Sequence, residues 1–142
     1  MSVPELRLRI ASLADAAVAR ALVVRFARDI GLTPRAASEA AIAASELVTN
    51  VVKYAGAGEL VIVEDPEGLR ITALDRGPGL ANPEELFEDG ISQGSRREPD
   101  RPLKGGLGTG GGALRRLCDR VEISARPGGG TIVEIRKLRP AR

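Results

Sequence analysis

Three polar side chains fall on one face of an apolar, helix-like segment, residues 34–54. Glu46 and Asn50 are four residues apart, and Lys53 follows three residues later. At 100° per residue, Asn50 lies about 40° from Glu46 and Lys53 about 20° to its other side. A carboxylate, an amide and an amine beside a buried stripe make this face a candidate site for a polar ligand. A solvated helix surface is the alternative, but asparagine is a poor helix former and has no cap to make in mid-helix.

A second candidate follows an apolar run that ends at residue 74. Asp75 comes directly after this expected strand and precedes two glycines spaced by one residue, Gly77 and Gly79. A short carboxylate at a strand end can accept from an exocyclic amine, and glycines let the backbone approach a flat ligand without a Cβ clash. A plain tight turn is the alternative, since Asp, Gly and Pro are turn residues.

The third candidate is the glycine-rich stretch 105–112, which opens an expected helix. Free N–H groups and the helix dipole at such a start favour phosphate. A flexible joint is the alternative, but so many glycines are costly in chain entropy without a use. Gly106, Gly108 and Gly111 match the dinucleotide pattern G-x-G-x-x-G, yet a charged loop precedes them where that fold needs a strand. The Walker A pattern is absent from the sequence.

Hydrophobic periodicity predicts the elements that must position these residues. Helices alternate with strands too irregularly for a doubly wound parallel sheet. We therefore expect an α+β fold: a two-layer sandwich with a mixed, mostly antiparallel sheet and its helices on one face. The expected strands are 5–11, 59–64, 69–74, 120–126 and 131–138, and the expected helices are 14–30, 34–54 and 107–118.

The first two helices carry recognisable start and stop residues. Gly31 ends the first helix, and Thr33 with Pro34 forms an N-cap followed by proline at the first helical position. The first helix should bury residues spaced by four: Val18, Leu22, Phe26 and Ile30. The second should bury Ala37, Ala40, Ala41, Ala44, Leu47, Val48 and Val51.

The chain is short enough to form one domain, residues 1–142. A short helical turn is expected at 84–87, and residues 88–106 have almost nothing to bury. We expect a mobile loop there, of the kind that serves as a lid or a binding loop. The tail 139–142 is expected to be frayed.

Composition excludes several classes of protein. The sequence has no histidine, which excludes histidine-based catalytic triads and histidine-ligated metals. Its one cysteine, Cys118, fits a reducing cytoplasm. No apolar run approaches a membrane span, and no signal peptide is evident, so we expect no membrane association. A net charge of +2 with only 2% aromatic residues argues against nucleic-acid binding.

The three candidate segments together indicate a protein family far more specifically than any one of them does. The segments ELVTN (46–50), DRGPG (75–79) and GLGTG (106–110) resemble the N, G1 and G2 boxes of the GHKL ATPase superfamily, the Bergerat fold. The small size and the missing histidine point to its serine/threonine kinase branch, which is related to bacterial anti-sigma factors. Within that branch the chain is most similar to RsbT-type switch kinases, and the similarity covers nearly the whole sequence.

The resemblance implies a role for each matching residue. Glu46 would be the catalytic general base, and Asn50 would coordinate a Mg²⁺ ion that bridges the phosphates of ATP. Asp75 would accept from the adenine amine, with the residues Gly77, Gly79 and Thr131 beside the base. The G2 segment would present its backbone to the phosphates through Gly106, Leu107, Gly108, Thr109 and Gly110. Lys53 would face phosphate or substrate, and the loop 88–106 would be the ATP lid.

The resemblance also implies a function. It predicts ATP- and Mg²⁺-dependent phosphorylation of a serine or threonine on a STAS-domain partner, within a partner-switching stress-response pathway. The regulated target would be a PP2C-type phosphatase or, alternatively, a sigma factor that the kinase binds and sequesters. A non-catalytic, nucleotide-gated binding module is a second alternative. A dimer-cycling ATP hydrolase is a third, but it would need a further domain. Two departures from the branch stand out: the loop between Gly94 and Gly105 is long, and Gly111 stands where related sequences tend to have leucine.

Overall fold

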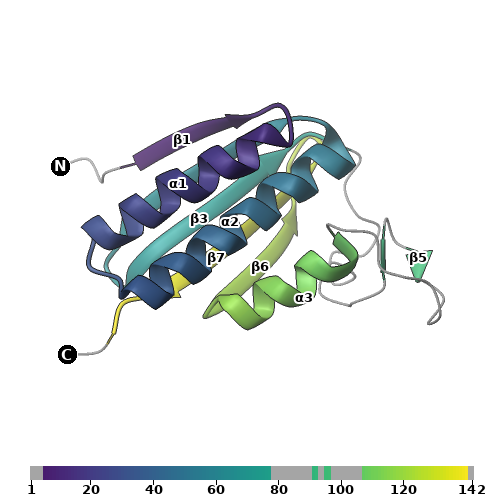
Figure 1. The fold of residues 1–142 in the computed structure, drawn as a ribbon. Helices are drawn as coiled ribbons and strands as arrows, with labels where there is room; N and C mark the ends of the chain where they lie inside the picture. The colour runs from purple at the N-terminus through teal and green to yellow at the C-terminus, as the bar shows by residue number, and fades with distance from the viewer. Residues whose placement is uncertain (1–4, 78–90, 93–94, 97–106, 141–142) are drawn as a thin grey trace.

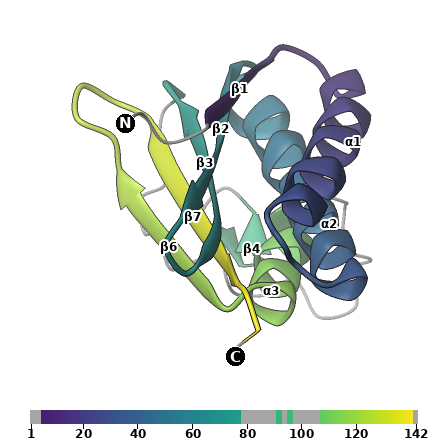
Figure 2. The same ribbon diagram turned by 90° about the vertical axis from the view of Figure 1, so that its left-hand side faces the viewer.

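A five-stranded antiparallel sheet forms one layer of the protein and helices form the other (Figure 1). The computed structural model describes residues 5–77, 91–92, 95–96 and 107–140. The strand order is β1-β2-β3-β7-β6, and every neighbouring pair is antiparallel. Figure 2 shows the helices gathered on one face of this sheet, which confirms the expected architecture. The sheet strands are β1 Glu5–Ile10, β2 Gly58–Asp65, β3 Gly68–Asp75, β6 Arg120–Ala125 and β7 Thr131–Leu138; the helices are α1 Ala14–Asp29, α2 Pro34–Ala55 and α3 Leu107–Leu117.

The core lies between the sheet and α2. Alternate residues of the central strands point toward the helices, because successive side chains of a strand point to opposite faces. Leu60, Ile62, Ile71 and Ile135 are almost completely buried there. Burying four aliphatic side chains of this size contributes roughly 1.5–3 kcal/mol each. These buried side chains set the distance between α2 and the sheet, and thereby the position of the polar face of α2.

Helix α2 begins and ends where the sequence predicts. The Oγ1 of Thr33 accepts a hydrogen bond from the N–H of Ala36 at 3.1 Å, and Pro34 follows as the first helical residue. Gly56, with φ +84°, ends the helix. The whole predicted stripe is buried, and Ala43 is buried as well. These small side chains let α2 lie close to the elements around it.

The predicted buried stripe of α1 is only partly correct: Phe26 and Ile30 pack against the core, but none of the four predicted residues is among the fully buried ones. The fully buried residues are Ala19, Val23 and Ala27, whereas Val18 is 45% exposed. Helix α1 packs against the alanine-rich α2, and small residues at the contact allow the close approach. The longer side chains of the predicted stripe are displaced to the flank of the contact or to solvent.

The third helix is anchored at its C-terminal half. Leu114 is fully buried in the same core, and α3 packs against both α2 and β6. Between β3 and α3 the structure describes two short paired strands that the sequence did not predict, β4 Ile91–Ser92 and β5 Ser95–Arg96. The rest of the expected loop 88–106 and the expected helical turn 84–87 lie outside the described residues. No helix in the described ranges is long and apolar enough to cross a membrane.

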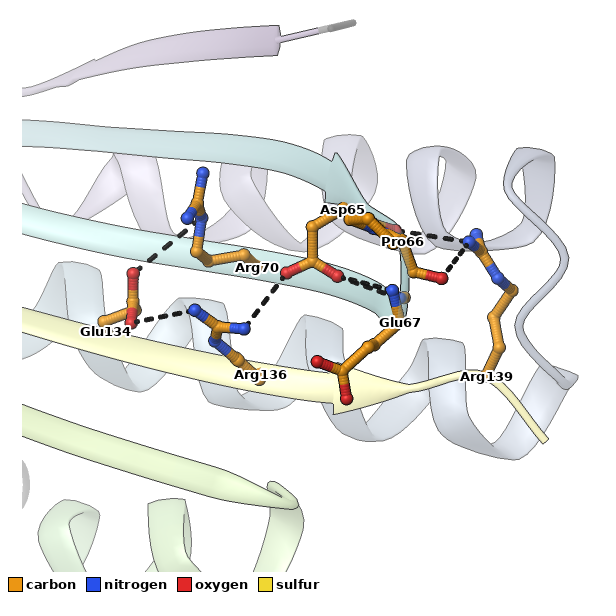
Figure 3. A network of polar contacts seen from close by, with 8 residues as sticks. Asp65, Pro66, Glu67, Arg70, Glu134, Arg136 and Arg139 are labelled. Atoms are coloured by element: carbon orange, nitrogen blue, oxygen red, sulfur yellow. Dashed lines mark hydrogen bonds and ion pairs between the residues drawn. The ribbon is translucent and has the colours of Figure 1, made fainter. Parts of the chain in front are cut away.

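A polar network ties Arg139, just after β7, to the β2–β3 turn (Figure 3). The N–H of Arg139 donates to the carbonyl of Glu67 at 2.9 Å. Its guanidinium donates to Glu64 Oε2 at 2.8 Å and to the carbonyls of Ile30 and Pro66 at 3.1 Å each. The expectation of a frayed tail is therefore wrong for Arg139, because its side chain is a multidentate donor that bridges three segments. Residues 141–142 lie outside the described residues.

Candidate active site

Asn50 is the most unusual polar residue of the core-facing helices. Both polar atoms of its side chain, Oδ1 and Nδ2, are buried and have no hydrogen-bond partner within the described ranges. Leaving a buried amide unsatisfied costs about 1–3 kcal/mol. Its neighbour Thr49, in contrast, donates its hydroxyl to the carbonyl of Ser45 at 2.8 Å. The predicted alternative of a solvated helix face therefore fails at Asn50, because its amide is shielded from water.

Glu46 lies one turn earlier on the same helix and is half-buried. Burial raises the pKa of its carboxyl group, and the positive charge of Arg20 on α1 partly offsets this effect. A carboxylate with a raised pKa is a better proton acceptor at neutral pH than an ordinary glutamate. No sequence pattern pointed to Arg20, which is brought to Glu46 by the packing of α1 on α2.

Lys53 continues this polar face at the exposed end of α2. Its Nζ lies 5.4 Å from the centroid of the Tyr54 ring, within the range of a cation–π contact. The predicted helical face of Glu46, Asn50 and Lys53 thus runs from a half-buried carboxylate through a buried amide to an exposed amine.

Asp75 is the last residue of β3, so it ends the strand rather than following it as predicted. The sheet register pairs Asp75 with Gly58, and Gly58 with the fully buried Ile10. Residues in one row of a sheet share a face, so this row, and Asp75 with it, faces the helices. A Cβ on Gly58 would come within 2.8 Å of Cγ1 of Val51, the residue after Asn50. The strand end and the polar helix face are therefore neighbours.

Two backbone donors hold the carboxylate of Asp75. Its Oδ1 accepts from the N–H of Gly77 at 2.9 Å and from the N–H of Thr131 at 3.2 Å. Within the described ranges no residue donates to Oδ2, so this oxygen is left to accept from a ligand. The structure thereby brings the predicted pair Asp75 and Thr131 together, although 56 residues separate them in sequence.

Glycine is required at two positions around Asp75. A Cβ on Gly77 would come within 2.6 Å of the Cβ of Ala55, at the end of α2. Gly130 has φ +109°, and its Cβ would collide with the backbone carbonyl of Asp75. Sequence reasoning did not single out Gly130, although its place directly before Thr131 was a usable signal.

Arg126 is a further residue that the sequence analysis missed. Its Nη1 donates to the carbonyl of Asp75 at 3.2 Å, from the β6–β7 turn. This contact ties the backbone of Asp75 to the β6–β7 turn. It follows from the pairing of β3 with β7, so no local sequence pattern could have revealed it.

The predicted phosphate segment forms the start of α3. Leu107, Gly108, Thr109 and Gly110 are the first four residues of this helix, where backbone N–H groups have no partner within the helix. Helix α3 packs beside α2, which carries Glu46 and Asn50. Gly79 and Gly106, the two remaining predicted site residues, lie outside the described residues.

Comparison with known proteins agrees with this arrangement. The model of the histidine kinase-like ATPase domain family matches residues 10–137. The chain belongs to this family. The serine/threonine-protein kinase RsbT of Bacillus subtilis (strain 168) is 32% identical over 124 residues, which are 84% of this chain and 86% of that protein.

Two solved structures share the fold of this family. The RsbU and RsbW domains of Rv1364c from Mycobacterium tuberculosis match 98% of this chain with a TM-score of 0.64 and 21% identity. This chain spans 34% of the length of that structure. The mycobacterial sensor histidine kinase MprB matches 96% of this chain over the whole of its own length, with a TM-score of 0.51 and 18% identity. At these identities the two structures support the fold alone.

Proposed function

We propose that this protein is an ATP-dependent serine/threonine protein kinase that phosphorylates a STAS-domain partner and thereby controls a PP2C-type phosphatase. The observation that carries the proposal is the buried amide of Asn50, which lacks a partner in the described ranges and lies one helical turn from Glu46. The family and the similarity to a serine/threonine kinase support it.

The residues present fit a Mg²⁺–ATP complex. An amide oxygen is a suitable ligand for Mg²⁺, which is usually held by one or two protein groups together with phosphate oxygens. Within the described ranges no group of three His, Cys, Asp or Glu side chains lies together as a metal cage. Asn50 Oδ1 would hold the ion. When bound, Mg²⁺ would neutralise part of the negative charge of the phosphates.

Glu46 would accept the proton of the serine or threonine hydroxyl of the partner. Its raised pKa brings it closer to the pH at which the transfer takes place. The two N–H donors on Oδ1 of Asp75 orient the carboxylate, so that Oδ2 can accept from the exocyclic amine of adenine. The free N–H groups at the start of α3 would bind the phosphates.

The remaining assignments rest on the resemblance of the sequence to its family. They are a phosphate or substrate contact for Lys53, adenine contacts for Gly77, Gly79 and Thr131, and phosphate contacts for the segment 106–110. Residues 88–106 would form the ATP lid. The end of β3 would then bind the base of ATP, and the start of α3 would bind its phosphates. Together these two contacts would place the γ-phosphate near Glu46.

A phosphotransfer assay tests the proposal. The purified chain is incubated with radiolabelled ATP, Mg²⁺ and STAS-domain proteins from the same genome, and label on serine or threonine is measured. Glu46→Gln should lower the rate about 10²–10⁴-fold, the usual contribution of a general base, and leave ATP binding intact. The matched control is Glu122→Gln, an exposed residue of β6 that should transfer at the wild-type rate.

Two results would contradict the proposal. One is phosphate transfer by Glu46→Gln at the wild-type rate, which would mean that Glu46 is not the general base. The other is binding of Mg²⁺–ATP by the wild type without transfer to any STAS-domain protein. The second result would favour the nucleotide-gated binding module, and copurification of a sigma factor would favour the sigma-binding alternative.

A further inference from the structure

A cavity of about 530 Å³ opens at the end of the sheet; its lining includes Asp75 but not Glu46, Asn50 or Lys53. It lies where β2 begins at Gly58, which pairs with Ile10, the last residue of β1, and with Asp75, the last residue of β3. A side chain cannot fill the gap at Gly58, since a Cβ there would collide with the carbonyl of Leu74. The neighbouring Ala57 adds only a methyl group. The result is a notch between two strand ends.

Three arginines line this notch: Arg9, Arg76 and Arg126. Arg126 is held in place by its hydrogen bond to the carbonyl of Asp75. Arg9 and Arg76 are exposed, and within the described ranges their side chains make no hydrogen bond or ion pair. Arg76 reaches toward the β6–β7 turn, where its Nη1 lies 3.7 Å from the position of a Cβ on Gly128.

The two carboxylates of the notch balance only part of this positive charge. Glu59 Oε1 accepts from Arg7 Nη1 at 2.7 Å, so this carboxylate is already paired with a residue outside the lining. Asp75 keeps its negative charge, because the two N–H groups that donate to its Oδ1 are neutral. Three arginines nevertheless outweigh this one carboxylate, so the notch carries net positive charge and its ligand should carry an anionic group.

The walls between the arginines are aliphatic. Ala11, Ala57 and Leu74 line the notch beside the charged groups, whereas the side chain of Ile10, also in the lining, is fully buried. An inorganic ion would leave these walls uncovered, whereas a carboxylate next to an apolar side chain would meet both surfaces. A volume near 530 Å³ is within the range that accommodates one or two amino-acid side chains.

We propose that this notch is a docking site for an acidic segment of a partner polypeptide, in which Arg9 and Arg76 bind its carboxylates. The notch shares Asp75 with the proposed adenine site, but Glu46, Asn50 and Lys53 of the phosphate-binding face are not among its lining residues. The inference does not depend on kinase activity, since it rests on the charge and shape of the sheet end.

A peptide titration tests this inference. The probe is a blocked hexapeptide of alternating leucine and glutamate, added to ¹⁵N-labelled protein with and without saturating Mg²⁺–ATP. We expect amide chemical-shift changes concentrated at Ala57, Gly58 and Leu74. Titration without nucleotide keeps the result interpretable if the protein proves not to bind ATP.

A matched pair of double variants assigns the binding to the notch. Exposed ion pairs are each worth a factor of roughly 1.4 to 5, so R9Q/R76Q should weaken peptide binding by about 2- to 25-fold. R25Q/R28Q removes the same charge from exposed positions of α1 and should leave the affinity unchanged. Thermal unfolding confirms that both variants are folded.

Four results would overturn the inference. The first is an equal loss of affinity in the two double variants, and the second is equally tight binding of a peptide with lysine in place of glutamate. Either result means that the arginines of the notch do not select an acidic peptide. Displacement of the peptide by Mg²⁺–ATP would make the notch part of the nucleotide site. Tighter binding of inorganic phosphate than of the peptide at the same amides would make it a small-ion site.

Discussion

Replacing Asn50 by leucine should stabilise the protein without nucleotide and abolish the stabilisation that nucleotide gives. Leucine has the branching of asparagine but no polar atoms, so Asn50→Leu removes two buried groups that lack a partner within the described ranges. The unsatisfied amide costs about 1–3 kcal/mol, and leucine is also the better helix former by up to roughly 0.5 kcal/mol. For a chain of 142 residues, 1 kcal/mol corresponds to about 3 °C in Tm. The Tm should therefore rise by about 3–10 °C.

Mg²⁺–ATP should raise the Tm of the wild type and offset most or all of the advantage of the variant. A ligand at 100 times its Kd stabilises the folded state by about 2.7 kcal/mol, which adds roughly 8 °C to the Tm of the wild type. The variant should gain nothing, because the group that would hold the ion is gone. Thermal unfolding of both proteins, with and without Mg²⁺–ATP, measures all four values.

The control for this experiment is Thr49→Val on the same helix. The hydroxyl of Thr49 is already hydrogen-bonded to Ser45, so its loss should be neutral or cost about 1 kcal/mol and should leave the effect of nucleotide intact. A lower Tm for Asn50→Leu without ligand would refute the reasoning, because it would mean that the amide has partners in the folded protein. A Tm of the variant that still rises with Mg²⁺–ATP would refute the role of Asn50 in binding.

Three further predictions follow from the site and its surroundings. Glu46→Gln should raise the Tm above pH 4.5 but not below it. The pKa of Glu46 is higher in the folded than in the unfolded protein, so the folded protein loses stability as pH rises from the unfolded pKa through the folded one, and glutamine removes this loss. Equal Tm values of wild type and variant across pH 3–8 would contradict this. Gly130→Ala should cost more stability than Gly129→Ala, by about 1 kcal/mol or more in urea unfolding. Both glycines have φ +109°, but only Gly130 has backbone in the way of a Cβ, so equal losses would show that the contact with Asp75 is unimportant. Burial raises the pKa of the Cys118 thiol to about 12, so iodoacetamide at pH 8 should alkylate it far more slowly in the native protein than in urea, as followed by mass spectrometry; similar rates would contradict its burial.

Local sequence signals determined the second helix and the residues on its faces. The cap at Thr33 and Pro34 and the spacing of the alanines act within a few residues of one another, so the start of the helix and its buried stripe follow directly from the sequence. The same periodicity failed for α1. Nearly every residue from 16 to 24 is apolar there, so several stripes fit the helical period. Only contact with α2 selects Ala19, Val23 and Ala27.

The candidate site divides in the same way. The types and spacing of Glu46, Asn50 and Asp75 were visible in the sequence, because each belongs to a short motif. The burial of the Asn50 amide, the contact of Thr131 with Asp75 and the charge of Arg20 near Glu46 were not. Each depends on segments far apart in the chain, which are brought together when α1 packs on α2 and β3 pairs with β7. The sequence alone thus determined which groups are available for chemistry, and the tertiary structure decided which of them are desolvated and adjacent, since both properties arise only from packing.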